Sequence, residues 1–189
     1  MAMYDWDGTT ARELGKAYDW DGTTARELGK GYDWDGTNAC LFYSAETEYF
    51  NGGAKVAYTT YNYYHNGESY AAILTVGTTI YSKLNNSTDQ TIIRFTANLT
   101  NIKTLSFVFD SVSLQNNGTL FVGVSTYTDM GTPNVFITSQ WTKYTTVRSS
   151  GTKTVDVSSL SGTYQICISF SCSTGLGGNY TCSKIIGEE

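Results

Sequence analysis

The stretch that decides the fold is YQICISFSC, residues 164–172. Its large apolar residues recur at every second position: Tyr164, Ile166, Ile168 and Phe170. Gln, Cys and Ser fill the positions between them. Because successive side chains of a strand point to opposite faces, this period of two predicts a β-strand with one core face and one wetter face.

Two further segments, residues 104–113 and 119–128, show the same alternation. The residues expected on their core faces are Leu105, Phe107, Phe109, Leu120, Val122 and Val124. Shorter candidate strands are expected at residues 56–64, 70–76, 91–97, 135–139, 143–147, 153–157 and 180–186. Gly- and Asn-rich turns separate them, and no segment has a helical period. The sequence therefore predicts an all-β protein in which residues 40–189 form an antiparallel, jelly-roll-like β-sandwich.

Residues 1–39 precede this domain and contain a 14-residue repeat. The first copy, residues 4–17, reads YDWDGTTARELGKA, and the second, residues 18–31, reads YDWDGTTARELGKG; a third, incomplete copy follows. Asp-Gly is a strong short-range hairpin signal, so each copy is expected to form a short β-hairpin. The alternative is a short helix opened by a capping box at residues 10–13.

The even period of the repeat keeps residues of one parity on one face from copy to copy. One such face carries a stripe of large apolar residues: Trp6, Leu14, Tyr18, Trp20, Leu28, Tyr32 and Trp34. A stripe of this kind is costly when exposed on a monomer. We therefore expect the repeat segment to serve attachment and self-association into a symmetric homo-oligomer, with a trimer as one form.

The letters Asp-x-Asp-Gly-Thr at residues 5–9 resemble the first motif of haloacid dehalogenase-like phosphatases. That resemblance implies an aspartyl nucleophile, a second Asp as general acid, and Mg²⁺. The family places the motif after a buried apolar strand, whereas only Met-Ala-Met-Tyr precedes Asp5, and an active site has no reason to occur three times. Calcium is a weak alternative, with Asp5, Asp7, Asp19, Asp21, Asp33 and Asp35 as ligands. Solvated turns are favoured, so no metal or cofactor is predicted.

Other catalytic signatures are sparse. The single histidine, His65, stands beside an Asn-Gly turn, and a structural role is favoured over that of a catalytic base. Glu46 and Glu48 are a carboxylate pair of the kind that glycoside hydrolysis uses, but two exposed carboxylates near a strand are the simpler interpretation. The sequence therefore predicts that the protein is not an enzyme.

The cysteines and the charge limit the compartment and the partners. Cys40, Cys167, Cys172 and Cys182 lack C-x-x-C spacing, so buried thiols are favoured over a zinc site, and a Cys172–Cys182 disulfide across a hairpin is the alternative. A net charge of −5 disfavours nucleic acid. No apolar run is long enough to cross a membrane, and no secretory signal is recognisable. Synthesis in a cytoplasm is expected, without membrane insertion.

Aromatic side chains suggest a binding surface. Sugars present C–H faces that stack on aromatic rings, and such rings give rigid contact area. The candidate glycan-binding residues are Tyr58, Tyr61, Tyr63, Tyr64, Trp141 and Tyr144. The alternative is that these are ordinary strand aromatics that pair on a sheet or lie in a subunit interface.

The order of the C-terminal features gives a further resemblance. A WTKYTTV strand at residues 141–147, a KTVDVSSLSGTYQI segment at residues 153–166, and a closing YTCSKIIGEE strand at residues 180–189 resemble jelly-roll carbohydrate-binding modules. They are also similar to β-sandwich domains of phage tail and virion proteins, some of which carry Tyr-x-Trp-Asp-Gly-Thr repeats.

The second resemblance implies a structural and adhesive component of a phage virion, in a tail, baseplate or head fibre. Such a protein is made in the host cytoplasm, is extracellular after release, contacts other virion proteins and binds bacterial cell-surface polysaccharide. A stand-alone bacterial surface glycan-binding module is the first alternative. A filament subunit or capsid decoration protein that binds no ligand is the second.

Overall fold

The computed structural model describes two compact units, Met1–Thr47 with Glu188–Glu189 and Glu48–Gly187. In the repeat segment it describes the strand backbones, at residues 3–6, 11–14, 17–20, 25–28, 30–34 and 39–44. Beyond them it describes residues 46–63 (61–63 by backbone only), 72–85, 90–115, 118–126, 141–172 and 177–189. The sequence placed the domain boundary after residue 39. The division falls later because β6 (Ala39–Ser44) pairs with β5 (Lys30–Trp34).

Each repeat forms one antiparallel hairpin. β1 (Met3–Trp6) pairs with β2 (Ala11–Leu14), and β3 (Ala17–Trp20) pairs with β4 (Ala25–Leu28) in the same register. The strand at residues 11–14 confirms the hairpin prediction and excludes the short helix, which one turn alone would not stabilise. The predicted Asp-Gly turns lie outside the described residues.

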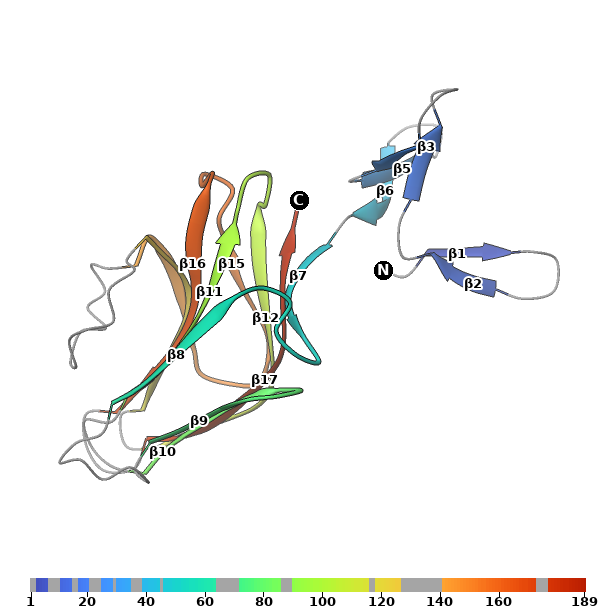
Figure 1. Cartoon of the computed structure of the whole chain (residues 1–189). Coiled ribbons are helices and arrows are strands. Elements are labelled where there is room, and N and C mark those ends of the chain that lie inside the picture. Colours follow the sequence, from blue (N-terminus) through green and yellow to red (C-terminus); the bar gives the residue numbers. More distant parts are fainter. Residues whose placement is uncertain are drawn as a thin grey trace. The chain divides into compact units, whose positions relative to one another are not determined.

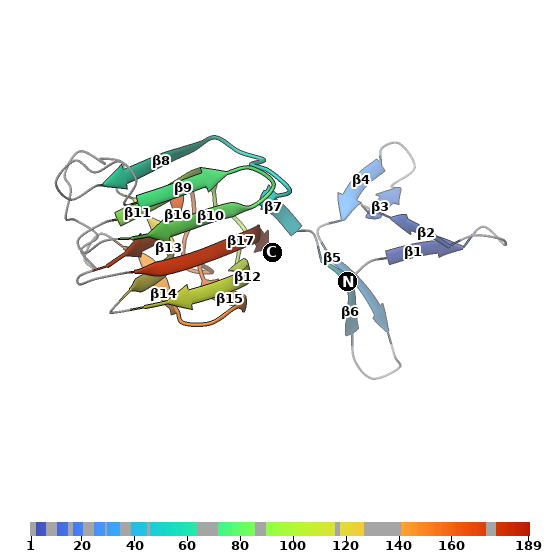
Figure 2. The same ribbon diagram turned by 90° about the horizontal axis from the view of Figure 1, so that it is seen from below.

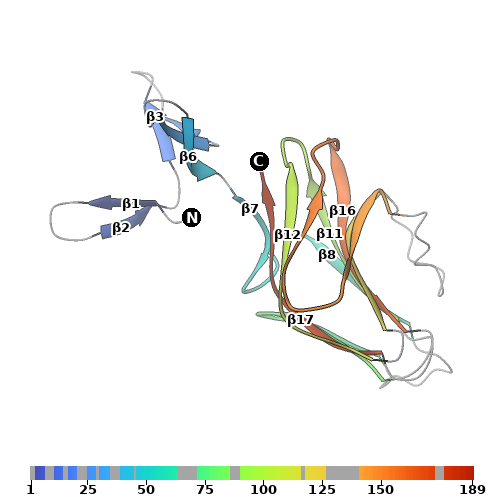
Figure 3. The ribbon, with the colours of Figure 1, turned by 180° about the vertical axis from the view of Figure 1, so that it is seen from behind.

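The second unit is a sandwich of two antiparallel sheets that face each other across the core (Figures 1 and 3). One sheet has the order β15-β12-β17-β10-β9, with β7 also paired to β17, and the other has the order β14-β13-β16-β11-β8. Their bounds are β7 (Glu46–Asn51), β8 (Tyr58–Tyr63), β9 (Ala72–Val76), β10 (Ile80–Leu84), β11 (Gln90–Asn98), β12 (Thr104–Leu114), β13 (Thr119–Ser125), β14 (Lys143–Val147), β15 (Gly151–Asp156), β16 (Thr163–Ser171) and β17 (Gly178–Glu188).

The connectivity of the sandwich is that of a jelly roll. β13 pairs with β14, β12 with β15, β11 with β16 and β10 with β17, so the strands form one long antiparallel ribbon. The ribbon is folded over so that successive pairs alternate between the two sheets (Figure 2). The all-β, jelly-roll-like sandwich predicted from the sequence is therefore confirmed.

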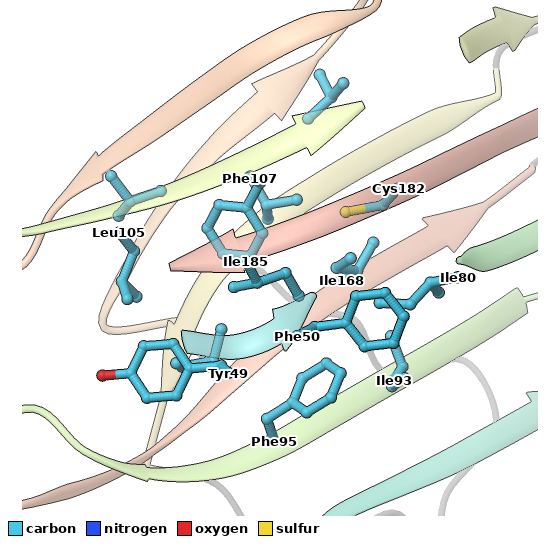
Figure 4. Close-up of a cluster of buried hydrophobic side chains, with 14 of the residues drawn as sticks. Tyr49, Phe50, Ile80, Ile93, Phe95, Leu105, Phe107, Ile168, Cys182 and Ile185 are labelled. Carbon is cyan, nitrogen blue, oxygen red and sulfur yellow. The ribbon is translucent and has the colours of Figure 1, made fainter. Parts of the chain in front are cut away.

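The core lies between the two inner faces. Leu105, Phe107, Leu120 and Val122 are fully buried, as their alternation predicted. Figure 4 shows side chains from both sheets meeting there, with Phe50 of β7 beside Phe95 of β11 at a ring-centroid distance of 6.2 Å. Because apolar surface buried in this way drives folding, these residues contribute to the stability of the unit.

Strand β10 is missing from the sequence prediction because a polar residue occupies one of its core-facing positions. Ile80, Ser82 and Leu84 are all buried in the structure. The Ser82 hydroxyl forms a 2.6 Å hydrogen bond with the hydroxyl of Thr91 on β11, in the other sheet. A buried hydroxyl needs a partner of this kind, and the sequence of β10 alone does not reveal it.

Strand β17 changes the parity of its buried residues partway along its length. Tyr180 and Cys182 are buried, Ser183 and Lys184 are half-buried, and burial resumes at Ile185. At this point the Ser183 hydroxyl donates a 2.7 Å hydrogen bond to the carboxylate of Asp110 on β12. The alternation of buried residues in β17 is therefore interrupted at Ser183 and Lys184.

Candidate functional site

The outer face of the five-stranded sheet carries the best candidate for a binding surface. One row of the register runs across four of its strands, from Tyr144 on β14 through Gly123 and Cys167 to Arg94 on β11. Residues directly opposite in an antiparallel pair have neighbouring side chains on the same face. The row therefore connects an exposed aromatic residue at the sheet edge with buried positions in the middle of the sheet.

Three aromatic rings gather at the β14 end of this row. The rings of Phe121 and Tyr144 meet edge to face, with centroids 5.5 Å apart and an interplanar angle of 88°. Trp141, which precedes β14, lies 5.9 Å from Tyr144 and 6.4 Å from Phe121. We call these three residues the aromatic cluster. Tyr144 is 44% exposed and Trp141 only 7%, so Tyr144 is the more accessible residue of this pair.

Gly123 allows β14 to approach β13 closely enough for the aromatic cluster to form. A Cβ atom at Gly123 would clash with the carbonyl oxygen of Lys143 and would lie 2.6 Å from Cα of Tyr144. Both of those atoms belong to the backbone, which yields less easily than a flexible side chain. The absence of a side chain at position 123 thus permits the close approach of the Tyr144 backbone.

Polar side chains flank the aromatic cluster on the same face. The register places Ser125, Gln165 and Thr96 in the next row across β13, β16 and β11. The Thr96 hydroxyl donates a 3.3 Å hydrogen bond to Oε1 of Gln165. Amide and hydroxyl groups beside an exposed ring are the combination that recognises sugar hydroxyls while the ring packs on the sugar C–H face.

Cys167 lies beneath this surface and is 1% exposed. Burial raises the pKa of its thiol to about 12, against a smaller opposing effect of the Arg94 charge. The three described cysteines, Cys167, Cys172 and Cys182, are buried and in the thiol form. The predicted buried thiols are therefore confirmed for these three residues, and the side chain of Cys40 lies outside the described part.

We expect the three buried cysteines of the native protein to resist alkylation by iodoacetamide at pH 8.5. The test uses a Cys40→Ser variant, so that only these three thiols are present. The thiolate is the reactive form, and the raised pKa keeps Cys167 protonated at that pH. The same shift should make the free energy of unfolding fall as the pH rises above about 9, because the unfolded thiol then loses its proton first. Mass spectrometry should find modification only after unfolding in urea, and rapid modification of native Cys167 would contradict the prediction.

The structure separates the predicted glycan-binding residues. Trp141 and Tyr144 are brought together, whereas Tyr58 lies on β8, at the opposite edge of the same sheet. Tyr58 pairs with the core residue Phe95 in the register, and its ring packs 5.8 Å from that ring. It therefore belongs to the inner face. Tyr61 and Tyr63 also lie on β8, but their side chains, like all of Tyr64, are outside the described residues.

The stripe residues lie on the hairpin strands, but the register does not keep them on one face. Leu14 pairs with Met3 and Leu28 with Ala17, so both leucines have the opposite register parity to Trp6 and Trp20. The prediction of a single stripe is therefore wrong at the leucines, because the connection within each hairpin reverses the parity. The side chains of these residues lie outside the described part.

The predicted calcium ligands also have no described side chains. Asp5, Asp19 and Asp33 are placed by backbone only, and Asp7, Asp21 and Asp35 are not described. Among the side chains that are described, no group of three or more His, Cys, Asp or Glu residues is placed to hold a metal ion. His65 also lies outside them.

No protein-family model matches the chain, and no curated protein matches its sequence. The fold and the surface define the class of protein: a jelly-roll β-sandwich with an aromatic cluster on the outer face of one sheet. In the described part of the chain, no helix has the length and hydropathy needed to span a bilayer.

Sequence analysis missed three residues of this surface: Phe121, Gly123 and Gln165. The alternation in residues 119–128 and 164–172 places all three on the face opposite the core. This pattern was the available signal, because an aromatic residue on the outer face of a strand is a candidate for binding.

Proposed function

We propose that the chain is a structural and adhesive component of a phage virion, in a tail, baseplate or head fibre. In this proposal the sandwich binds a host-surface glycan through the outer face of the five-stranded sheet, and the hairpin repeats hold copies of the chain together and attach them to other virion proteins. The protein is made in the host cytoplasm and becomes extracellular when particles are released.

The observation that carries the binding proposal is the arrangement of Tyr144. Tyr144 is 44% exposed, and its ring packs edge to face on Phe121 and at a tilt against Trp141. A ring fixed before binding loses little conformational entropy when a ligand packs on it. The half-buried amide of Gln165, in the next row of the same face, supplies hydrogen-bonding groups for sugar hydroxyls.

We expect Tyr144→Ala to weaken binding to bacterial cells or purified cell-wall polysaccharides roughly tenfold, the loss of about 1.4 kcal/mol of ring contact. Fluorescently labelled full-length chain would be titrated against a panel of both. Tyr58→Ala is the matched control, because Tyr58 has nearly the same exposure, 42%, at the other edge of the sheet. Tyr144→Phe should retain most of the affinity.

Two outcomes would contradict the proposed binding surface. Equal losses in Tyr58→Ala and Tyr144→Ala would remove the special role of Tyr144. No saturable binding by the unmodified chain would exclude both the adhesive virion component and the stand-alone surface module, and would favour a filament subunit or decoration protein that binds no ligand.

The hairpin repeats have a separate test. Deletion of residues 4–31 removes the first two copies and is expected to reduce a homo-oligomer to monomers, because their Trp, Tyr and Leu residues are lost. Light scattering coupled to size-exclusion chromatography measures the mass, and circular dichroism checks that the sandwich remains folded. An unchanged oligomer would assign self-association to the sandwich.

A further inference from the structure

We propose that the surface around Tyr144 selects polysaccharides that carry repeated negative charges, through Arg148, which directly follows β14, and Lys153 of β15, whose ammonium group lies over the turn between these strands. This inference rests on the proposed glycan binding and names the class of glycan. The chemistry that would be recognised is an extended sugar or polyol chain with carboxylate or phosphodiester groups.

The first supporting observation is the division of charge along the chain. The whole chain has a net charge of −5, but the residues of the sandwich unit, Glu48–Gly187, include eight Lys and Arg against six Asp and Glu. Residues 1–47 include four Lys and Arg against nine Asp and Glu. The excess of acid thus lies in the repeat segment and at the C-terminus, and the sandwich itself is slightly basic.

The second observation is that the cations of the sandwich are concentrated near the aromatic cluster. Residues 141–155 contain Lys143, Arg148 and Lys153 and no acidic residue. Lys143 directly precedes Tyr144 on β14, and Arg148 directly follows the end of that strand. Both are exposed. Lys143 pairs with the core residue Val124 and has the parity of the inner face, whereas Arg148 has the parity of Tyr144. This part of the sheet edge therefore combines the accessible ring with the positive charge of Arg148.

Asp156, the first acidic residue after this stretch in the sequence, interacts with only one of these cations. Hydrogen bonds from the hydroxyl and the N–H of Ser158 lower the pKa of Asp156, and the charge of Lys143 adds a smaller effect. Lys143 thus faces a carboxylate. The ammonium group of Lys153 instead folds over the turn, 3.2 Å from the hydroxyl of Ser149 and 3.5 Å from the carbonyl oxygen of Ser150. Arg148 and Lys153 remain the cations available to an anionic ligand.

The spacing favours a polymer over a small anion. Tyr144 and Arg148 are four residues apart along an extended strand, which corresponds to roughly 13 Å. This exceeds the screening length of about 10 Å at 0.1 M salt, so a single charge placed over the Tyr144 ring would feel Arg148 only weakly. A chain that packs one unit on the ring and continues along β14 brings a later charge to Arg148 and Lys153.

The test compares three polymers on the full-length chain: sodium polygalacturonate, which carries carboxylates; poly(glycerol phosphate), which carries phosphodiesters; and dextran, which is neutral. Tighter binding of either polyanion than of dextran, with affinity falling as salt rises from about 50 to 200 mM, is the expected result. The polyanion that binds more tightly identifies the source of the charge.

Two double variants with the same change of net charge locate the effect. Arg148→Gln with Lys153→Gln should weaken polyanion binding roughly fivefold and flatten its salt dependence. Lys55→Gln with Lys103→Gln removes two exposed cations elsewhere and should change neither. Thermal unfolding followed by circular dichroism shows whether each variant is folded.

The inference would be overturned if the two double variants lost the same amount of polyanion binding. It would also be overturned if dextran bound as tightly as both polyanions and its binding did not depend on salt. The proposed function would survive this result if Tyr144→Ala still reduced binding to cell-wall polysaccharide. If no polymer, cell or polysaccharide binds saturably, the proposed glycan binding itself fails, and the inference fails with it.

Discussion

Replacement of Phe170 by alanine is expected to lower the free energy of unfolding by about 3–5 kcal/mol. Phe170 lies on β16 in the middle of the five-stranded sheet and is fully buried. Its ring meets that of Tyr180, on the opposite sheet, edge to face at 5.6 Å. Truncation would leave a cavity between the two sheets and would remove this contact. Urea-induced unfolding, followed by circular dichroism, measures the change.

Phe121→Ala is the matched control for this prediction. Phe121 lies on the neighbouring strand β13 but faces outward and is only partly buried. The same chemical change should therefore cost clearly less, about 1–2 kcal/mol. Losses of equal size would contradict the assignment of Phe170 to the core face and of Phe121 to the outer face. A low cost for Phe121→Ala also makes it useful for testing the aromatic cluster in a folded protein.

Replacement of Gly178 by alanine is expected to cost about 3–5 kcal/mol, from two effects that act together. Gly178 has a φ of +98°, a conformation that residues with a Cβ atom rarely adopt. A Cβ atom there would also clash with the carbonyl oxygen of Ser113 and lie 3.1 Å from the backbone nitrogen of Gln115. Both neighbours are backbone atoms, one at the end of β12 and one just after it. The clash can therefore be relieved only if β17 moves away from β12.

The matched control is Gly162→Ala, which separates the two effects. Gly162 has nearly the same φ, +96°, but a Cβ atom there would meet no atom within 4 Å. Only the conformational cost should remain, about 1–2 kcal/mol. The difference between the two variants in urea-induced unfolding measures the clash at Gly178. Indistinguishable losses would show that β17 and β12 separate freely, against the close approach described above.

The sequence predicted much of the secondary structure because the period-two pattern is local. The strand expected at residues 143–147 is β14, and those expected at residues 104–113 and 91–97 match β12 and β11 to within a residue at each end. Strands β7 and β10 were missed. In β7, Tyr49 and Phe50 are adjacent and both buried, which breaks alternation, and in β10 a serine takes a core position. The candidate strand at residues 135–139 lies outside the described part.

The candidate site was predicted only in part. Trp141 and Tyr144 stood out as aromatic residues in a polar strand, and the structure brings their rings together. Tyr58 also stood out, yet it lies on the inner face at the far edge of the sheet. Its segment carries aromatic residues at both parities, so alternation gave no basis for deciding which tyrosines face the core.

By itself, the sequence determined the regularly alternating strands with their core faces and the hairpin repeat, because each of these depends on a pattern within a few neighbouring residues. Only the tertiary structure decided that β10 and β17, nearly one hundred residues apart, close the jelly-roll ribbon. It also decided that Phe121 would meet Trp141 and Tyr144. The physical reason is that strand pairing depends on packing and backbone hydrogen bonds between distant segments, and no local pattern specifies which strands will be neighbours.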